Sequence, residues 1–333
     1  MSDERPVSQI DALVRHQRWM EELDPDHPTW TVTLGSAERA CADYADVSDA
    51  LGNDPYPIGI RRGWQKQGLA SVANATRSIV AAMHGIRSVV QVPQVFDWCA
   101  FRPGAKEDYG SRAPTREEMR NMFWQMIACG ANGLMAYTFN EKHLAVNGKT
   151  FEERWADICA VGEEIRAKMP ILLSVEPAPT VADVPAGLCV RTWRSAGRDY
   201  LVAVNTGREP GRTTLRTGEK DPRTLDVSLG PIDVMFKEMP KFPEVRRDLA
   251  LLLDESVSYA DLRTAAFKSA KKLLKQVGLF DVYRGEKIPE GKKQYAMSFV
   301  IQDVEKTLTD QDTERVMEKL LAMFCKDFGA QLR

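Results

Sequence analysis

The strongest constraint on this chain is the spacing of apolar residues in its last quarter, residues 241–333. Within KFPEVRRDLALLLDE, Leu249, Leu251 and Leu253 occupy alternate positions, which predicts a strand with one buried face. Apolar residues then recur at helical spacing over 259–277, which predicts an amphipathic helix. Each of these elements has one apolar face, so we expect them to pack against each other.

Two β-rich runs and a second helix complete the pattern. The runs cover 279–283 and 295–301, and a connection rich in Gly, Pro and Lys joins them. Thr309 and Asp312 have the spacing of a capping box before a helix whose apolar stripe reaches Phe328. The resulting order, strand-helix-strand-strand-helix-strand, is typical of the ferredoxin-like split unit.

Four motifs in this quarter carry a family resemblance. KFPEVRRDLALLLDE, LFDVYRGEKIPEGKKQYAMSF, QDVEKTLTD and FGAQLR resemble the ferredoxin-fold anticodon-binding (FDX-ACB) domain that ends the beta subunit of bacterial phenylalanyl-tRNA synthetase. The resemblance covers the 93 residues from 241 to 333. It implies a module that binds the anticodon region of tRNA(Phe), whereas amino-acid activation belongs to the family's alpha subunit. Contact with an alpha subunit would need modules absent from this chain.

Aromatic and basic side chains on such a sheet are the candidates for RNA contact, because unpaired bases stack on rings and phosphates attract cations. Core packing is the competing explanation for the Phe and Tyr positions. A solvated helix face is the competing explanation for the basic run Lys271, Lys272 and Lys275. The predicted RNA-binding residues are Arg246, Arg247, Phe280, Tyr283, Lys292, Lys293 and Tyr295.

The first half of the chain alternates predicted strands and helices, which indicates a parallel sheet covered by helices. The strands are expected at 29–34, 87–96 and 133–139, and the helices at 10–23, 37–44, 69–84, 113–131 and 151–168. ELDPDHPTW, DPYPIG, VVQVPQVFDW, RAPTREEMR and GANGLMAYTF resemble the C-terminal half of a glycoside hydrolase (β/α)8 barrel. A full barrel needs ~250 residues, so this resemblance implies a partial barrel that lacks the first strands.

Three modules therefore follow: a partial barrel at 1–170, a small β-sandwich at 171–236, and a ferredoxin-like domain at 237–333. The fold class is multidomain, α/β with α+β. Short β-runs separated by the turn signals AGRD and TGREPGR predict the sandwich. No Ser/Gly linker separates it from the last module. We interpret the join at 236–239 as a fusion or an assembly artefact, which gives a chimeric chain.

The barrel segment has an incomplete set of catalytic carboxylates. Barrel glycosidases of this type use two carboxylates, at the ends of strands four and seven. In the strand-seven candidate VVQVPQVFDW, Gln91 and Gln94 occupy the matching positions, and an amide is neither a nucleophile nor a general acid. Asp97 and Glu141 could line a cleft. Glu4 resembles the end of a strand four, and the competing explanation is a frayed residue near the start of the chain. Asp54, Tyr56, Trp98, Tyr137 and Asn140 also fall where a barrel keeps its site.

Composition excludes several other classes. The chain is 44% apolar and 28% charged, it contains no run of ~18 apolar residues, and its start is polar rather than a secretory signal. Its six cysteines show no CxxC spacing and are expected to be buried free thiols, and its four histidines have no metal-ligand spacing. From residue 241 onward there are 17 Lys and Arg against 15 Asp and Glu, so charge alone does not indicate a nucleic acid.

We therefore expect a cytoplasmic tRNA-binding protein with no cofactor, metal, membrane or DNA. The alternatives are an inactive carbohydrate-active hydrolase fragment, which would have a carbohydrate partner, and a chimeric chain without a selected function.

Overall fold

A computed structural model describes residues 3–33, 41–59, 68–101, 111–146, 148–218, 223–239, 242, 244–270, 272–285, 288–303 and 306–333. The chain divides into two compact units. The N-terminal unit comprises Met1–Leu215 and Asp226–Glu238, and the C-terminal unit comprises Arg216–Leu225 and Met239–Arg333.

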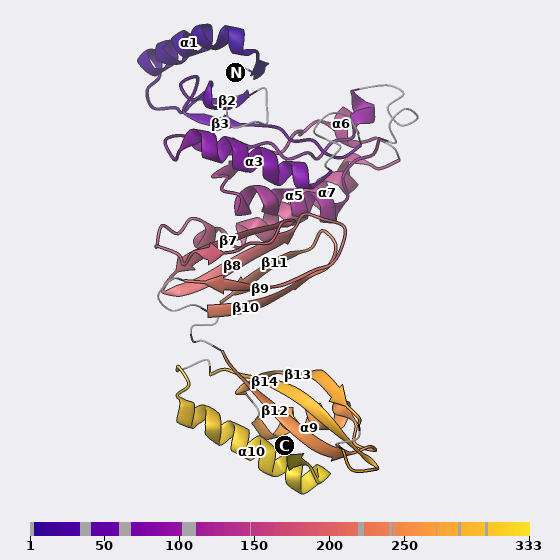
Figure 1. Cartoon of the computed structure of the whole chain (residues 1–333). Helices are drawn as coiled ribbons and strands as arrows, with labels where there is room; N and C mark the ends of the chain where they lie inside the picture. Colours follow the sequence, from indigo (N-terminus) through magenta and orange to yellow (C-terminus); the bar gives the residue numbers. More distant parts are fainter. Residues whose placement is uncertain are drawn as a thin grey trace. The chain divides into compact units, whose positions relative to one another are not determined.

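The N-terminal unit is built on a five-stranded sheet whose strands lie side by side in chain order, and every pairing is parallel. Helices alternate with these strands in the chain (Figure 1). This confirms the predicted parallel sheet of a partial barrel. The strands are β1 (Asp3–Arg5), β2 (Trp30–Thr33), β3 (Ala50–Gly52), β4 (Ser88–Gln91) and β5 (Gly133–Leu134), and the helices are α1 (Ile10–Leu23), α3 (Ala70–Met83), α5 (Arg116–Ala128), α6 (Glu141–Leu144), α7 (Phe151–Arg166) and α8 (Met169–Leu172).

Strands β4 and β5 are shorter than predicted. Pro93 follows the end of β4 and has no N–H to donate, so the ladder between the two strands is interrupted there. Beyond the break, the N–H of Tyr137 donates to the carbonyl of Pro93 at 3.1 Å, and Gln94 pairs with Tyr137 in an isolated parallel bridge. Residues 37–40 of the predicted helix at 37–44 lie outside the described residues.

Glu4 is not a frayed terminal residue. It lies in β1, which pairs in parallel with β2. The hydroxyl of Tyr44 donates to the carbonyl of Arg5 at 2.5 Å and holds this strand against the rest of the unit. Edge pairing with β2 therefore orders this segment, an effect that local sequence does not reveal.

Helix α5 is buried on nearly all sides, from Met119 to Ala128 except Arg120. Its Asn121 side chain donates to the carbonyls of Asn205 (2.9 Å) and Ile232 (2.8 Å), on and beside a second sheet. That sheet has the order β11-β8-β7 (Val234–Glu238, Arg198–Asn205, Leu188–Ser195). The other three-stranded sheet has the order β10-β9-β6 (Arg223–Leu229, Gly211–Thr217, Val181–Ala182), and together they form the predicted small sandwich (Figure 1).

The C-terminal unit has the predicted strand-helix-strand-strand-helix-strand order. Its four strands lie in the order β13-β14-β12-β15, and all pairings are antiparallel. This is the ferredoxin-like arrangement. The elements are β12 (Val245–Asp254), α9 (Tyr259–Ala270), β13 (Leu274–Tyr283), β14 (Lys292–Ile301), α10 (Asp310–Phe328) and β15 (Gln331–Leu332).

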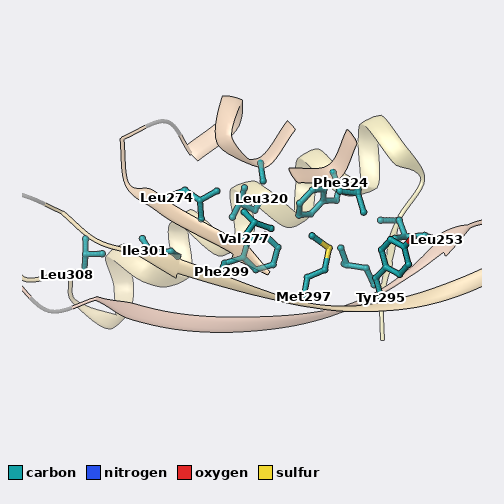
Figure 2. Close-up of a cluster of buried hydrophobic side chains, with 14 residues drawn as sticks. Leu253, Leu274, Val277, Tyr295, Met297, Phe299, Ile301, Leu308, Leu320 and Phe324 are labelled. Atoms are coloured by element: carbon teal, nitrogen blue, oxygen red, sulfur yellow. The ribbon is translucent and has the colours of Figure 1, made fainter. Parts of the chain in front are cut away.

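The core of this unit lies between one face of the sheet and the two helices. Every second residue of β14 from Lys293 to Ile301 is buried. Phe299 packs against Phe324 of α10, with ring centroids 6.0 Å apart, and Leu320 is also buried in the same cluster (Figure 2). Helix α10 begins at the predicted capping box, in which Thr309 and Asp312 each accept the other's backbone N–H.

Helix α9 ends at Ala270, seven residues before the predicted end at Val277. Leu274 and Val277 are buried, but they are buried as part of β13, where they pair with Ile301 and Phe299. Their helical spacing with the preceding residues is therefore incidental, and pairing with the central strand decides the conformation. Lys275 consequently lies on a strand rather than a helix, and Lys271 lies outside the described residues.

We expect residues 240–333, expressed alone, to unfold in one cooperative urea transition. Phe299→Ala should lower the free energy of unfolding by ~3–5 kcal/mol, because it opens a cavity in a closed core. Phe280→Ala, on the same sheet but with its side chain exposed, should change it by less than ~1 kcal/mol. Equal losses in the two variants would contradict the assignment of the buried face.

The cap of α10 should also make this fragment sensitive to acid. The pKa of Asp312 is lowered from 3.8 to about 2, mainly by the hydrogen bond from Lys306 and then by the N–H and hydroxyl of Thr309. A lowered carboxyl pKa contributes stability above about pH 4 that is lost as the pH falls towards 2. Asp312→Asn should therefore reduce the difference in urea midpoint between pH 5 and pH 2. Glu318→Gln, on the same helix, should leave that difference unchanged, because the Glu318 carboxylate accepts no hydrogen bond within the described part of the chain.

Candidate nucleic-acid interface

One face of the C-terminal sheet carries neither helix. The side chains of this open face alternate with the core residues, and the strand register sets them in rows across the sheet. Its middle is a floor of small residues, Ala250, Gly278, Ala296 and Ser298, in adjacent rows. A Cβ added to Gly278 would lie 2.6 Å from the hydroxyl oxygen of Ser298, so any larger residue here would displace that hydroxyl. The open face comprises Arg246, Asp248, Ala250, Leu252, Asp254, Gln276, Gly278, Phe280, Asp281, Tyr283, Lys292, Gln294, Ala296, Ser298 and Val300.

A cation and an aromatic ring flank one end of this floor. The guanidinium carbon of Arg246 lies 5.8 Å from the ring centroid of Phe280, and the Phe280 side chain is 57% exposed. A register shift between Leu279 and Asp281 displaces Phe280 from the regular alternation. Arg246 also donates to the carboxylate of Asp248 at 3.1 Å. This end therefore presents an accessible ring next to a positive charge.

A second aromatic-basic pair flanks the other end. Tyr283 is 41% exposed and pairs with Gln294, whose side-chain oxygen accepts a hydrogen bond from Arg333 at 2.8 Å. Arg333 reaches this row because its own N–H donates to the carbonyl of Ala250. The sequence prediction omitted Arg333 and Gln294. The alternation on β14 indicates Gln294, but only the position of β15 beside β12 brings Arg333 to this face.

Three of the predicted RNA-binding residues do not belong to the open face. Tyr295 is 93% buried in the core, so its ring has no free face for a base. Lys293 is also buried, and its ammonium donates to the carbonyl of Glu255 at 2.7 Å. Arg247 lies in the inner row and pairs with Asp310 at the start of α10 at 3.2 Å. These residues hold the unit together, while Arg246, Phe280, Tyr283 and Lys292 remain candidates for RNA contact.

Lys293 belongs to a cluster of charged side chains at one end of the sheet. Glu255 pairs with Arg284 at 2.5 Å and with Lys293 at 3.5 Å. The pKa of Glu255 is lowered, first by the hydrogen bond from Arg284 and to a smaller extent by Lys293. Both cations are thus paired within this cluster. Arg246 is also paired, with Asp248, but Arg246 and Lys292 lie on the open face and therefore stay the basic candidates there.

The last quarter of the chain matches a known protein family. Residues 240–333 match the family model described as "Ferredoxin-fold anticodon binding domain". This confirms the resemblance of the last quarter of the chain. The matched segment contains all of the strands and helices of the ferredoxin-like unit, from β12 to β15.

Relatives of the anticodon-binding domain are phenylalanine–tRNA ligase beta subunits. The chain is 48% identical over 111 residues to that of Bacteroides fragilis, 50% over 97 residues to that of Porphyromonas gingivalis, and 45% over 100 residues to that of Geobacillus kaustophilus. These matches cover 33%, 29% and 30% of this chain. The chain spans only 14%, 12% and 12% of the length of those relatives, respectively.

Solved structures similar to about 70% of the chain include alpha-amylases. One from Geobacillus thermoleovorans has a TM-score of 0.43 and 14% identity, over 70% of this chain and 57% of that chain. One from Anoxybacillus has a TM-score of 0.44 and 12% identity, over 70% and 56%. Likeness at this level carries neither an activity nor a substrate to the N-terminal unit.

In the N-terminal unit, Gln91 and Gln94 are structural. The Gln91 amide is buried and donates to Asn53 (2.7 Å) and Thr76 (2.9 Å). The Gln94 amide is buried and bonds both the N–H and the carbonyl of Ile58, at 2.9 and 2.8 Å. Gln91 joins β4 to the segment after β3, and Gln94 joins the segment after β4 to that same segment. Hydrogen-bonded amides therefore occupy the positions predicted for strand seven.

Asp97 also has a structural partner set. One carboxylate oxygen accepts from the N–H of Cys99 (2.9 Å) and the hydroxyl of Ser111 (2.7 Å), and the side chain is buried. It lines a cleft of about 530 Å³ together with Arg112, Arg154 and Asp157. The buried Arg154 donates to the carbonyl of Pro114, and desolvation lowers its pKa. The cleft is therefore lined by both acidic and basic side chains, and its lining does not identify a pair of catalytic carboxylates.

The other barrel candidates lie elsewhere. Glu141 is exposed at the first position of α6, after Asn140, which caps that helix. Neither Glu141 nor Glu4 is among the described residues that line the cleft. Tyr56 and Tyr137 stack with ring centroids 6.2 Å apart, and Trp98 contacts Tyr56 edge to face at a centroid distance of 6.1 Å. Asp54 lies two positions before Tyr56 in the chain.

Within the described ranges, no three His, Cys, Asp or Glu side chains gather as a metal site, and no helix is long and apolar enough to span a bilayer. The cysteines differ from the expectation of burial. Cys41 and Cys189 are buried, Cys99 and Cys129 are half-buried, and Cys159 and Cys325 are exposed.

We expect the full chain to show no turnover of an activated aryl glycoside. The strand-seven positions hold amides, and loss of general acid–base help alone removes ~10²–10⁴-fold in rate. The measurement is release of the aryl leaving group over a panel of sugars. Turnover that disappears in Asp97→Asn would show that this buried carboxylate is catalytic, and our interpretation of the strand would then be wrong.

Proposed function

We propose that residues 240–333 bind the anticodon region of tRNA through the open face of the ferredoxin-like sheet. The observation that supports this most directly is the family match, which spans the same segment as the complete fold. A phenylalanine–tRNA ligase beta subunit is the type of protein to which such a domain contributes, as the names of the relatives state.

The chemistry of the face suits single-stranded RNA. Phe280 and Tyr283 expose rings on β13 and are three positions apart, a spacing of roughly 10 Å along a strand. Each ring can therefore stack a different unpaired base, a contact worth ~1–3 kcal/mol. The floor of small side chains on β12, β13 and β14 allows a nucleotide to approach the sheet closely. Arg246 and Lys292, at opposite ends of the face, are placed to meet phosphates.

The localisation and the protein partner of this chain are also part of this proposal. A tRNA ligand implies a cytoplasmic protein, and a synthetase alpha subunit would be a partner of the larger assembly. We propose no aminoacylation activity for this segment, because the family performs that reaction in the alpha subunit. We also propose no carbohydrate ligand, because the barrel carboxylates do not form a pair.

The test uses the full chain and a tRNA(Phe) anticodon stem-loop, with binding measured across a range of salt concentrations. Phe280→Ala and Tyr283→Ala should each weaken binding by ~1–3 kcal/mol without changing the salt slope. Tyr283→Phe should bind like the parent, because it keeps the ring. Arg246→Gln and Lys292→Gln should each reduce the slope of log K against log salt by ~0.7–0.9.

A matched control separates this face from charge in general. Arg263→Gln removes an exposed cation from α9, on the covered side of the sheet, and should leave binding unchanged. Melting curves must show that each variant is folded. If folded Phe280 and Tyr283 variants bind like the parent, stacking on the open face is wrong. If the parent does not bind even at low salt, the proposed RNA function is wrong.

A further inference from the structure

Two cysteines of the N-terminal unit lie in direct contact although 60 positions separate them in the chain. The sulfur atoms of Cys129 and Cys189 are 3.4 Å apart. Cys129 caps the C-terminal end of α5, and Cys189 is the second residue of β7, so the contact joins the helix to the sandwich. Both are free thiols.

The surroundings of the pair give the two sulfurs different roles. The Cys129 thiol donates to the sulfur of Cys189, and the Nη2 of Arg77 donates to the same sulfur at 3.3 Å. The hydrogen bond from Cys129 lowers the pKa of Cys189; burial opposes this effect and the charge of Arg77 adds to it. The pKa of Cys129 is raised, mainly because its proton is held in that hydrogen bond. Arg191 is the other cation beside the pair, and its charge also favours a thiolate at Cys129.

We propose that Cys129 and Cys189 are a redox-active pair that a small peroxide oxidises to a disulfide. The Cys189 thiolate attacks one oxygen of the peroxide, the O–O bond breaks, and a sulfenic acid and hydroxide form. The Cys129 sulfur then attacks the Cys189 sulfur, its proton leaves, and the sulfenic oxygen departs as water. In sum, two thiols and one hydrogen peroxide give one disulfide and two waters.

The local structure allows the bond to close. The sulfurs must approach from 3.4 Å to about 2.05 Å. Cys189 is held in the ladder opposite Val204, so the movement falls to Cys129. Cys129 lies at a helix end followed by Gly130, whose φ of 112° is accessible mainly to glycine. Cys129 is half-buried and Cys189 is buried, so a small oxidant can reach the pair more readily than a bulky disulfide.

The bond would have a structural consequence. It would tie the end of α5 to β7, two elements that already pack through the cluster containing Trp124, Trp193 and Val202. A cross-link between distant positions restricts the unfolded chain. The oxidised N-terminal unit should therefore be the more stable form.

The experiment treats the full chain with hydrogen peroxide under native conditions. The expected product has lost two hydrogens, about 2 Da, and contains one cross-linked peptide pair bearing Cys129 and Cys189; dithiothreitol should reverse it. The melting temperature of the N-terminal unit should rise by roughly 5–10 °C. Cys129→Ser and Cys189→Ser should each abolish the cross-link, whereas Cys41→Ser, which removes another buried thiol, should not.

A second variant pair tests the role of Arg77 apart from folding. Arg77→Gln should slow disulfide formation by roughly threefold to tenfold, because less thiolate is present, and Arg77→Lys should recover most of the rate. The melting temperature of the reduced variants reports any purely structural loss from the Arg77 bond to the carbonyl of Leu188. The proposal is overturned if both thiols remain free to alkylation after peroxide treatment, or if the cross-link forms between other cysteines.

Discussion

The alternation of side chains along β14 is the constraint on which the C-terminal unit depends. Phe299 and its neighbours at two-residue spacing close the core against α10, and the residues between them are left on the other face. Because the period of a strand is two, burial of one row leaves the other row outward wherever the register is kept. The same hydrophobic burial that stabilises the unit therefore also creates the face that we propose binds RNA.

Helix α5 has the corresponding place in the N-terminal unit. It is capped at its start by Thr115 and Glu118, and its buried side chains contact both the helices of the parallel-sheet layer and the sandwich. The buried Glu118 pairs with Arg112 at 2.6 Å and also with Arg208 from the sandwich part, and the bond to Arg112 helps to lower its pKa. A buried carboxylate is tolerated only with such partners. The ion pairs of Glu118 thus hold the start of this helix between the two layers. The Cys129–Cys189 contact lies at the C-terminal end of the same helix.

Much of the fold could be predicted from residue spacing. The capping box at Thr309, the alternation in β12 and β14, and the β/α order of the first half all act within a few residues, and local sequence reports them. The errors arise where distant segments compete with local preference. Pairing with β14 takes Leu274 and Val277 out of the predicted helix, and Pro93 shortens the ladder between β4 and β5.

The candidate site follows the same division. The sequence by itself determined the fold of the last quarter, because strand and helix periods and a family pattern coincide there over one continuous segment. It also indicated the types of side chain that could meet RNA. Only the tertiary structure decided which of two adjacent residues faces outward: Arg246 and Lys292 lie on the open face, while Arg247 and Lys293 are turned to ion pairs and the core. The reason is physical, since a strand turns neighbouring side chains to opposite faces, and which face is buried depends on where the two helices pack.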